Sequence, residues 1–151
     1  MWNHKPSDRL HEWKEFRENI GILGIDEAVS KTSHLWSYAP YVNHYLDADT
    51  TAEWPDPWTL LHENYYCDLA KALGMLYTLY LSPHYGNDIK SLEIRIYKNP
   101  TNADVLNTVW IDDGKYILNL EFDTVVNKTQ VKENLILTNC YAVQDLQLNL
   151  Y

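Results

Sequence analysis

The pattern of hydrophobic and polar positions predicts helices in the first half of the chain. Apolar residues recur at helical spacing after Ser7, so we predict a first helix that Ser7 caps and that runs to about Ile20. A less regular stretch, 25–46, predicts only short helical turns. Asp56 followed by Pro57 joins a capping side chain to a proline at the first helical position, which predicts another short helix.

A longer helix is predicted over residues 65–81. Asn64 is placed to cap its start, and Pro83 follows its end. Apolar residues cover nearly the whole circumference of this segment. A helix with this pattern is buried on most sides, so we interpret it as the central helix of the fold.

The second half of the chain alternates between apolar and polar residues, as β-strands do. An Asp-Gly pair, Asp113 and Gly114, lies between two of these segments and predicts a hairpin. Helices first and antiparallel strands second define an α+β fold, with the central helix packed on an antiparallel sheet at about 92–145. The predicted strands are 92–97, 108–111, 115–122, 134–137 and 140–143.

The length and composition predict one folded domain over residues 1–151, with a helical half at about 1–85 and a sheet half at about 90–151. Six Trp, twelve Tyr and two Phe supply enough apolar surface to exclude a disordered chain. The net charge of −9 argues against direct binding to nucleic acid, because such proteins usually carry a basic patch.

Several other classes are excluded by what the sequence lacks. Two cysteines are too few for a disulfide framework, and no signal peptide or membrane-length apolar run is found, so we expect an intracellular protein that does not bind membranes. Asp47, Asp49 and Glu53 resemble a calcium loop, but Ala52 and Trp58 stand where that loop needs Gly and Glu. We therefore predict no metal site and no cofactor.

Cys67 is the candidate with catalytic chemistry. A thiol in the first turn of a helix faces free N–H groups and the positive end of the helix dipole, which can lower its pKa and make it a nucleophile. The segment 66–76 resembles the Cys-acidic-x-x-Ala helix of the transglutaminase-like (papain-related) core. Residues 108–119 resemble the strand pair that follows it, and the resemblance covers roughly residues 54–122.

The resemblance implies a cysteine nucleophile, a His base on the next strand and an Asp on the strand after it. Thr108 stands at the His position, with Asn107 beside it, and Asn119 stands at the Asp position. A cysteine nucleophile needs a base, and Thr cannot replace an imidazole. The candidate bases elsewhere in the chain are His62 and His84, while Asn119 could orient an imidazole.

Tryptophan and tyrosine crowd the first 60 residues. They can pack in the core, where each buries a large area, or form a partner surface, where Trp and Tyr dominate the binding energy. We therefore expect a protein partner, with a second copy of the chain as one option. The interface candidates are Trp36, Tyr38, Tyr41, Trp54 and Trp58.

The sequence supports three functional hypotheses. The first is a non-enzymatic protein-interaction or assembly component on a transglutaminase-like scaffold. The Asn- and Tyr-rich, Gly-poor composition of the chain resembles that of small tailed-phage proteins. This resemblance predicts a virion-associated protein or a host-takeover protein in the host cytoplasm. The second is a cysteine-dependent acyl-transfer enzyme, a hydrolase or a transamidase, that uses Cys67. The third is an acidic mimic of nucleic acid that blocks a host protein.

Overall fold

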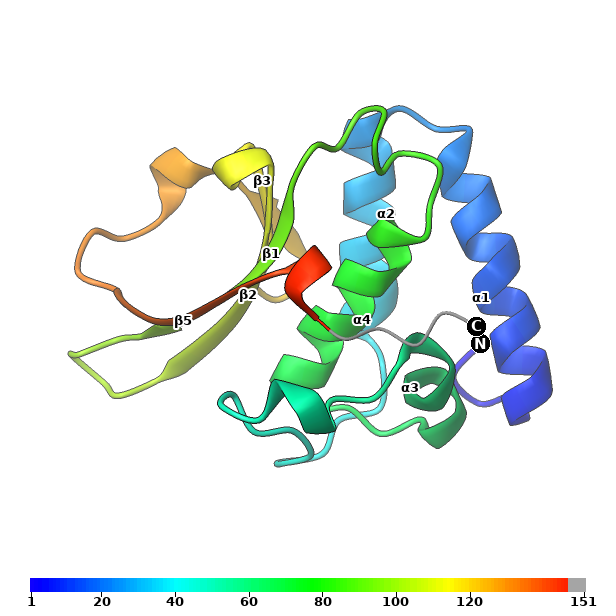
Figure 1. The fold of residues 1–151 in the computed structure, drawn as a ribbon, viewed down its shortest axis with the longest axis horizontal. Coiled ribbons are helices and arrows are strands. Elements are labelled where there is room, and N and C mark those ends of the chain that lie inside the picture. Colours follow the sequence, from blue (N-terminus) through cyan, green and yellow to red (C-terminus); the bar gives the residue numbers. More distant parts are fainter. Residues whose placement is uncertain (147–151) are drawn as a thin grey trace.

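The computed structural model describes residues 1–146 and has the predicted α+β architecture (Figure 1). The helices come first in the chain, and the strands follow them and form one antiparallel sheet in the order β4-β3-β2-β1-β5. The helices are α1 (Pro6–Gly21), α2 (Ile25–Ser37), α3 (Pro57–Glu63) and α4 (Asp68–Tyr80). The strands are β1 (Leu92–Lys98), β2 (Val105–Ile111), β3 (Tyr116–Glu121), β4 (Thr124–Val126) and β5 (Ile136–Ala142).

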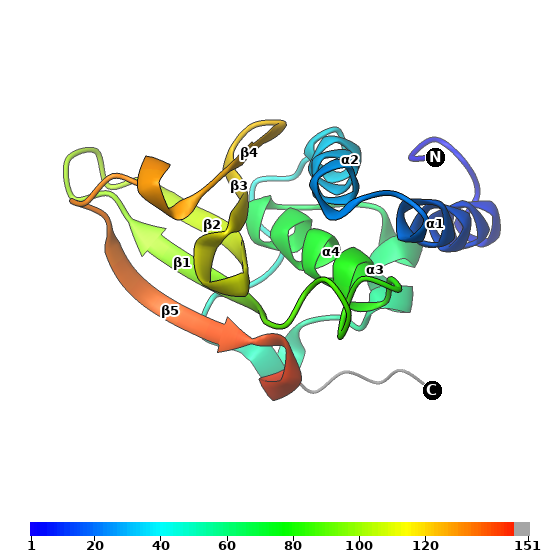
Figure 2. The same ribbon diagram turned by 90° about the horizontal axis from the view of Figure 1, so that it is seen from above.

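The central helix, α4, packs on the sheet and on the neighbouring helices α2 and α3, while α2 also contacts β3 and β4 (Figure 2). Its Gly74 lets Trp36 of α2 pack directly on the backbone, because a Cβ at this position would collide with the indole ring. One turn further along, Thr78 Oγ1 accepts hydrogen bonds from the buried indoles of Trp13 at 3.0 Å and Trp36 at 2.9 Å. Two tryptophans therefore link α1 and α2 to α4.

The start of α4 differs from the prediction by three residues. Asn64 ends α3 in the left-handed conformation, with φ of 59°, which asparagine tolerates better than most residues. Tyr66 then forms an isolated parallel bridge with Tyr41, so its backbone is extended. Cys67 consequently stands at the N-cap of α4, before the first turn, where we had predicted it inside the helix.

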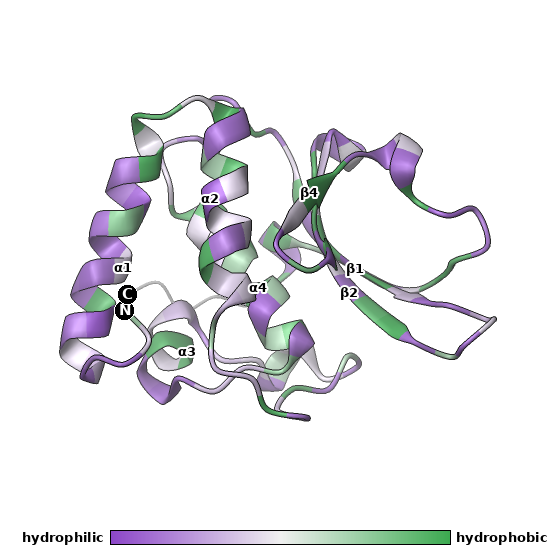
Figure 3. Ribbon diagram, turned by 180° about the vertical axis from the view of Figure 1, so that it is seen from behind, coloured by the Kyte–Doolittle hydropathy of each residue, from purple (hydrophilic) through white to green (hydrophobic). Residues whose placement is uncertain are grey.

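The segment 25–46 was expected to hold only short turns, and this expectation is wrong. It begins with the continuous helix α2, whose Val29 and Trp36 are buried in the core. In contrast, α1 carries mostly hydrophilic residues along its outer surface (Figure 3) and buries Trp13 and Ile20. The spacing of Ile25, Val29 and Trp36 in fact fits one face of a helix, and this face packs on the core.

The two faces of the sheet are both covered. Val109 and Ile111 of β2 face the helices and belong to the main core. Between them, Trp110 points to the other face and joins Ile117 in a smaller cluster, which the segment 127–135 covers with apolar side chains. Along β2, odd-numbered residues therefore face α4 and even-numbered residues face away from it.

The predicted hairpin between β2 and β3 is confirmed, and its turn residues Asp112, Asp113 and Gly114 all have positive φ. Two strands were predicted near the end of the chain, but the structure has one strand there, β5. It pairs continuously with β1 apart from one bulge. The short strand β4 was not predicted. No helix within residues 1–146 is long and apolar enough to cross a membrane.

Candidate functional site

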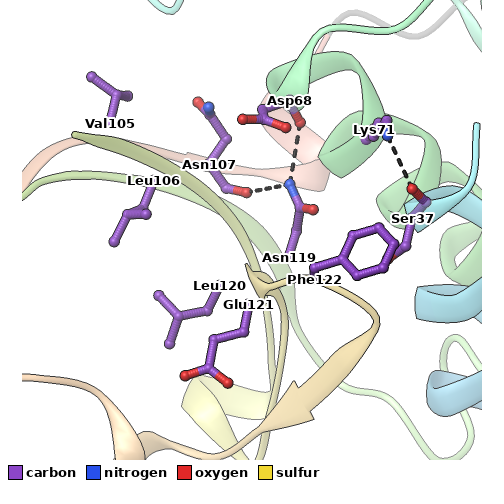
Figure 4. A pocket seen from close by; sticks show the side chains of 10 residues that line it. All are labelled: Ser37, Asp68, Lys71, Val105, Leu106, Asn107, Asn119, Leu120, Glu121 and Phe122. Atoms are coloured by element: carbon purple, nitrogen blue, oxygen red, sulfur yellow. Dashed lines mark hydrogen bonds between the residues drawn. The ribbon is translucent and has the colours of Figure 1, made fainter. Parts of the chain in front are cut away.

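The amino end of α4 meets the neighbouring ends of β2 and β3 (Figure 4). Asn119 lies at an irregular position of β3 with φ of 64°. Its Nδ2 donates to the main-chain oxygen of Asp68 at 3.2 Å and to that of Asn107 at 2.8 Å. One side-chain amide thus joins both strands to the start of the helix, beside Cys67, which is 5% exposed.

Asn107 lies on the face of β2 that is turned towards α4. It lines one surface hollow together with Cys67. Thr108, which we had aligned with the family His, is buried on the opposite face, where its Oγ1 donates to the Arg95 carbonyl at 2.7 Å and accepts from the Trp110 indole at 3.0 Å. Because side chains alternate between the two faces of β2, Thr108 points away from α4. This corrects the alignment of Thr108 with the family His.

Neither histidine considered as a base lies beside the cysteine. His62 is exposed at the last turn of α3 and does not line the hollow next to Cys67. His84 lies beyond the other end of α4, a helix about 20 Å long, and its ring is buried against Asp88 and the Ile20 carbonyl. The structure therefore brings together two of the predicted catalytic residues, the cysteine and Asn119, without His62.

A third histidine does lie near the thiol. His44 and Asp47 line the same hollow as Cys67, which has a volume of about 290 Å³. The Nε2 of His44 lies 3.5 Å from Oδ1 of Asp47. The bridge between Tyr41 and Tyr66 brings the loop with His44 to the start of α4. No local pattern in the sequence predicts that contact, so His44 was not among the predicted site residues.

A second hollow of about 230 Å³ adjoins the first at Asp68, Val105 and Asn107. We call the two together the α4 groove. Lys71 lies within it and donates from Nζ to the Ser37 carbonyl at 3.0 Å (Figure 4). Burial lowers the pKa of this lysine, although the nearby charge of Asp68 acts in the opposite direction.

Comparison with known proteins relates this fold to a bacterial protein. No protein-family model matches the chain, and no curated protein matches it in sequence. The structure of LapG from Legionella pneumophila is similar, with a TM-score of 0.70 and 11% identity over 90% of this chain and 75% of LapG. Calcium-bound LapG gives 0.72 and 11% over 92% and 77%, and EGTA-treated LapG gives 0.68 and 12% over 95% and 80%. The chain shares the fold of LapG.

The likeness in fold to LapG is consistent with the resemblance to the transglutaminase-like core at the level of architecture. The similarity to LapG covers nearly the whole chain, whereas the sequence resemblance covered only about 54–122. An identity of 11–12% shows the fold alone. In the positions that the resemblance assigned to Cys, His and Asp, the chain has Cys67, Thr108 and Asn119. Asn107, next to Thr108, is the residue that lines the hollow with Cys67.

The interface candidates lie in different environments. Trp36 is fully buried and so forms no part of the surface, which corrects its inclusion. Trp54 is half-buried and donates to the main-chain oxygen of Asp47 at 2.7 Å, while the partly exposed Trp58 packs on the side of α1. Tyr38 and Tyr41 are each 57% exposed, and Tyr41 lines the α4 groove.

The acidic loop that resembled a calcium site is engaged in packing contacts. Asp49 accepts a hydrogen bond from Asn139 of β5 at 2.9 Å. Within residues 1–146, no three His, Cys, Asp or Glu side chains lie close enough together to hold a metal ion.

Proposed function

We propose that this chain is a non-enzymatic protein-interaction component that binds its partner in the α4 groove. The observation that carries the proposal is that β2 has no imidazole at either candidate position. Thr108, which the resemblance aligns with the family His, is buried against Arg95 and Trp110, and Asn107 beside it lines the hollow with Cys67. A neutral amide cannot accept the proton of a thiol, so the strand offers Cys67 no base. The α4 groove is lined by exposed aromatic and polar residues, as a binding surface requires.

The role of Asn119 in this proposal is structural. Its amide donates to two main-chain oxygens, at 2.8 and 3.2 Å, and so holds β2 and β3 against the first residue of α4. A side chain that fixes three elements preorganises the groove walls, which lowers the entropy lost when a partner binds.

Alkylation of Cys67 tests whether the groove is catalytic. The protein is used with Cys140→Ser, because that second thiol is exposed. Rates of reaction with iodoacetamide are measured from pH 6 to 9, with Cys67→Ser as the blank. We expect a folded-state rate at pH 7 below about a tenth of the rate in urea, since a buried and unactivated thiol is inert. A fast reaction with a midpoint well below about 8.5 contradicts the proposal.

One observation favours a second candidate function, a cysteine-dependent acyl-transfer enzyme. His44 and Asp47 line the hollow beside Cys67, so an imidazole from the loop can replace the one missing from β2. In such an enzyme the imidazole accepts the thiol proton, the thiolate attacks an acyl carbon, and the protonated imidazole returns the proton to the leaving group. Water then hydrolyses the acyl-enzyme.

The same alkylation assay separates the two candidates. If His44 activates the thiol, His44→Ala slows the reaction at pH 7 at least about tenfold, whereas the matched His62→Ala leaves it unchanged. If both variants react as slowly as the parent, the non-enzymatic function is supported.

We further propose that the protein acts in a phage virion or in takeover of the host cell. This rests on the Asn- and Tyr-rich, Gly-poor composition. Mass spectrometry of purified virions tests it: detection of the chain at a fixed copy number supports a virion role. Detection only in infected-cell extracts supports host takeover, and detection in neither contradicts both roles.

A further inference from the structure

Two carboxylates in the α4 groove have no partner. Asp68 and Glu121 are exposed, and within residues 1–146 neither carboxylate forms an ion pair or accepts a hydrogen bond. The one cation among the described residues lining this hollow is Lys71, whose ammonium is buried and donates to the Ser37 carbonyl. The groove therefore presents two carboxylates to solvent that are not held in ion pairs.

Apolar side chains line the same hollow as these carboxylates. Val105 is 55% exposed and Phe122 is 64% exposed, and both line the hollow. The Phe122 ring packs edge-on against Tyr38, with ring centroids 5.1 Å apart, so it is held in place at the rim. Exposed apolar surface next to polar groups is typical of a binding site.

From this arrangement we infer that the α4 groove binds an extended segment of a partner protein that carries an arginine or lysine two positions away from an apolar residue. The cation lies against Asp68 and Glu121, and the apolar side chain contacts Val105 and Phe122. This inference rests on the proposed function, because it names the partner chemistry of the same groove. In an extended segment, alternate side chains point the same way and can enter the two adjoining hollows.

Charge complementarity favours a cationic segment as the occupant of the α4 groove. The net charge of −9 attracts a cationic segment and speeds its encounter with the groove. A nucleic acid would bring phosphates against Asp47, Asp68 and Glu121, which disfavours it.

The test uses fluorescein-labelled heptapeptides and fluorescence anisotropy with the full chain. The probe is Gly-Leu-Arg-Gly-Leu-Arg-Gly, and its counterpart has Glu in place of both Arg residues. We expect saturable binding of the Arg peptide that weakens at least about fivefold between about 50 mM and about 500 mM salt, and no binding of the Glu peptide. Equal binding of both peptides, or no binding of the Arg peptide, overturns the inference.

Variants locate the binding to the groove. Asp68→Asn with Glu121→Gln is expected to weaken Arg-peptide binding at least about tenfold, because both charged contacts are lost. The matched control, Glu18→Gln with Glu133→Gln, makes the same change in net charge at exposed sites outside the groove. Because Asp68 opens α4, the single variant Glu121→Gln repeats the test without altering the helix start. Equal weakening by the control pair overturns the inference.

Two further measurements distinguish failure of this inference from failure of the proposed function. Sedimentation of the free chain up to high concentration shows whether a second copy occupies the groove, and self-association that Phe122→Ser abolishes overturns the inference. An activated Cys67 thiol defeats the proposed function whatever the peptides do. An inert thiol with no Arg-peptide binding defeats only the inference about partner chemistry.

Discussion

Thr78 shows how one hydroxyl can hold several elements together. Its oxygen accepts hydrogen bonds from the indoles of Trp13 on α1 and Trp36 on α2, and it donates to the Gly74 carbonyl at 2.7 Å. All of these groups are buried. Buried indole N–H groups that lose their acceptor cannot turn to water, so the stability of the helical half depends strongly on this residue.

We predict that Thr78→Val lowers the free energy of unfolding by about 2 to 4 kcal/mol, because two buried donors lose their acceptor. Urea unfolding followed by tryptophan fluorescence measures the change. The matched control is Thr32→Val, whose buried hydroxyl only donates to the Ala28 carbonyl and leaves no donor unpaired. Equal destabilisation by the two substitutions would contradict the prediction.

At the scale of elements, the contact between α2 and α4 depends on a missing side chain. Gly74 sits where the Trp36 ring crosses the helix, and a methyl group there would overlap several ring atoms. The packing of these helices is therefore set by the absence of a Cβ at one position, although glycine itself weakens an isolated helix.

We predict that Gly74→Ala lowers the free energy of unfolding by about 1 to 3 kcal/mol. Helix propensity alone would raise stability by up to about 1 kcal/mol, so the sign of the measured change tests whether the clash dominates. Gly24→Ala is the control, because a Cβ there meets no atom within 4 Å. Stabilisation by Gly74→Ala, measured by urea unfolding, would refute the proposed packing.

A second contact links α2 to β3. Tyr116 donates a hydrogen bond from its hydroxyl to Asp26. Burial, followed by this hydrogen bond and the charge of Asp26, raises the pKa of Tyr116 to about 12 from its ordinary value of 10.0. A raised pKa in the folded state means that this contribution to stability is complete below pH 10 and is lost as the pH rises towards about 12.

We predict that Asp26→Asn makes stability fall less steeply between pH 10 and about 11.5, because the folded-state pKa of Tyr116 moves back towards its ordinary value. The free energy of unfolding is measured in urea at three pH values for both proteins. The other tyrosines contribute alike to both proteins and cancel in the comparison. The same decline in parent and variant would show that the contact is not formed.

At the scale of the whole molecule, the fold shared with LapG brings residues distant in sequence to the amino end of α4. Asn107 and Asn119 come from adjacent strands, and His44 comes from the loop after α2. The α4 groove is therefore lined by residues of a loop, a helix and two strands. A cleft of this kind can serve binding alone, since a fold does not by itself imply an activity.

We predict that Asn107→His makes Cys67 react with iodoacetamide at least about tenfold faster at pH 7, because the imidazole then faces the thiol and stabilises its thiolate. The assay uses the Cys140→Ser background. Asn107→Gln is the control, since it lengthens the side chain without adding a base. Acceleration by Thr108→His and none by Asn107→His would show that the opposite face of β2 is the one that faces the thiol.

The sequence alone determined the features that depend on neighbouring residues. Asp56 before Pro57 predicted the start of α3, where the Asp56 side chain accepts from the Thr59 backbone N–H at 2.8 Å. Asp113 with Gly114 predicted the hairpin, and the order of helices and strands predicted the α+β class. These signals are local because capping and turn conformations act through the backbone of a few residues.

Only the tertiary structure decided which residues meet at the groove. The face that Asn107 presents is set by the register of β2 against its neighbours, and a shift of one residue would exchange it with Thr108. The burial of Trp36 and the approach of His44 to Cys67 likewise depend on contacts between distant segments. Such contacts arise from packing of the whole core, which leaves no pattern in the sequence around each residue.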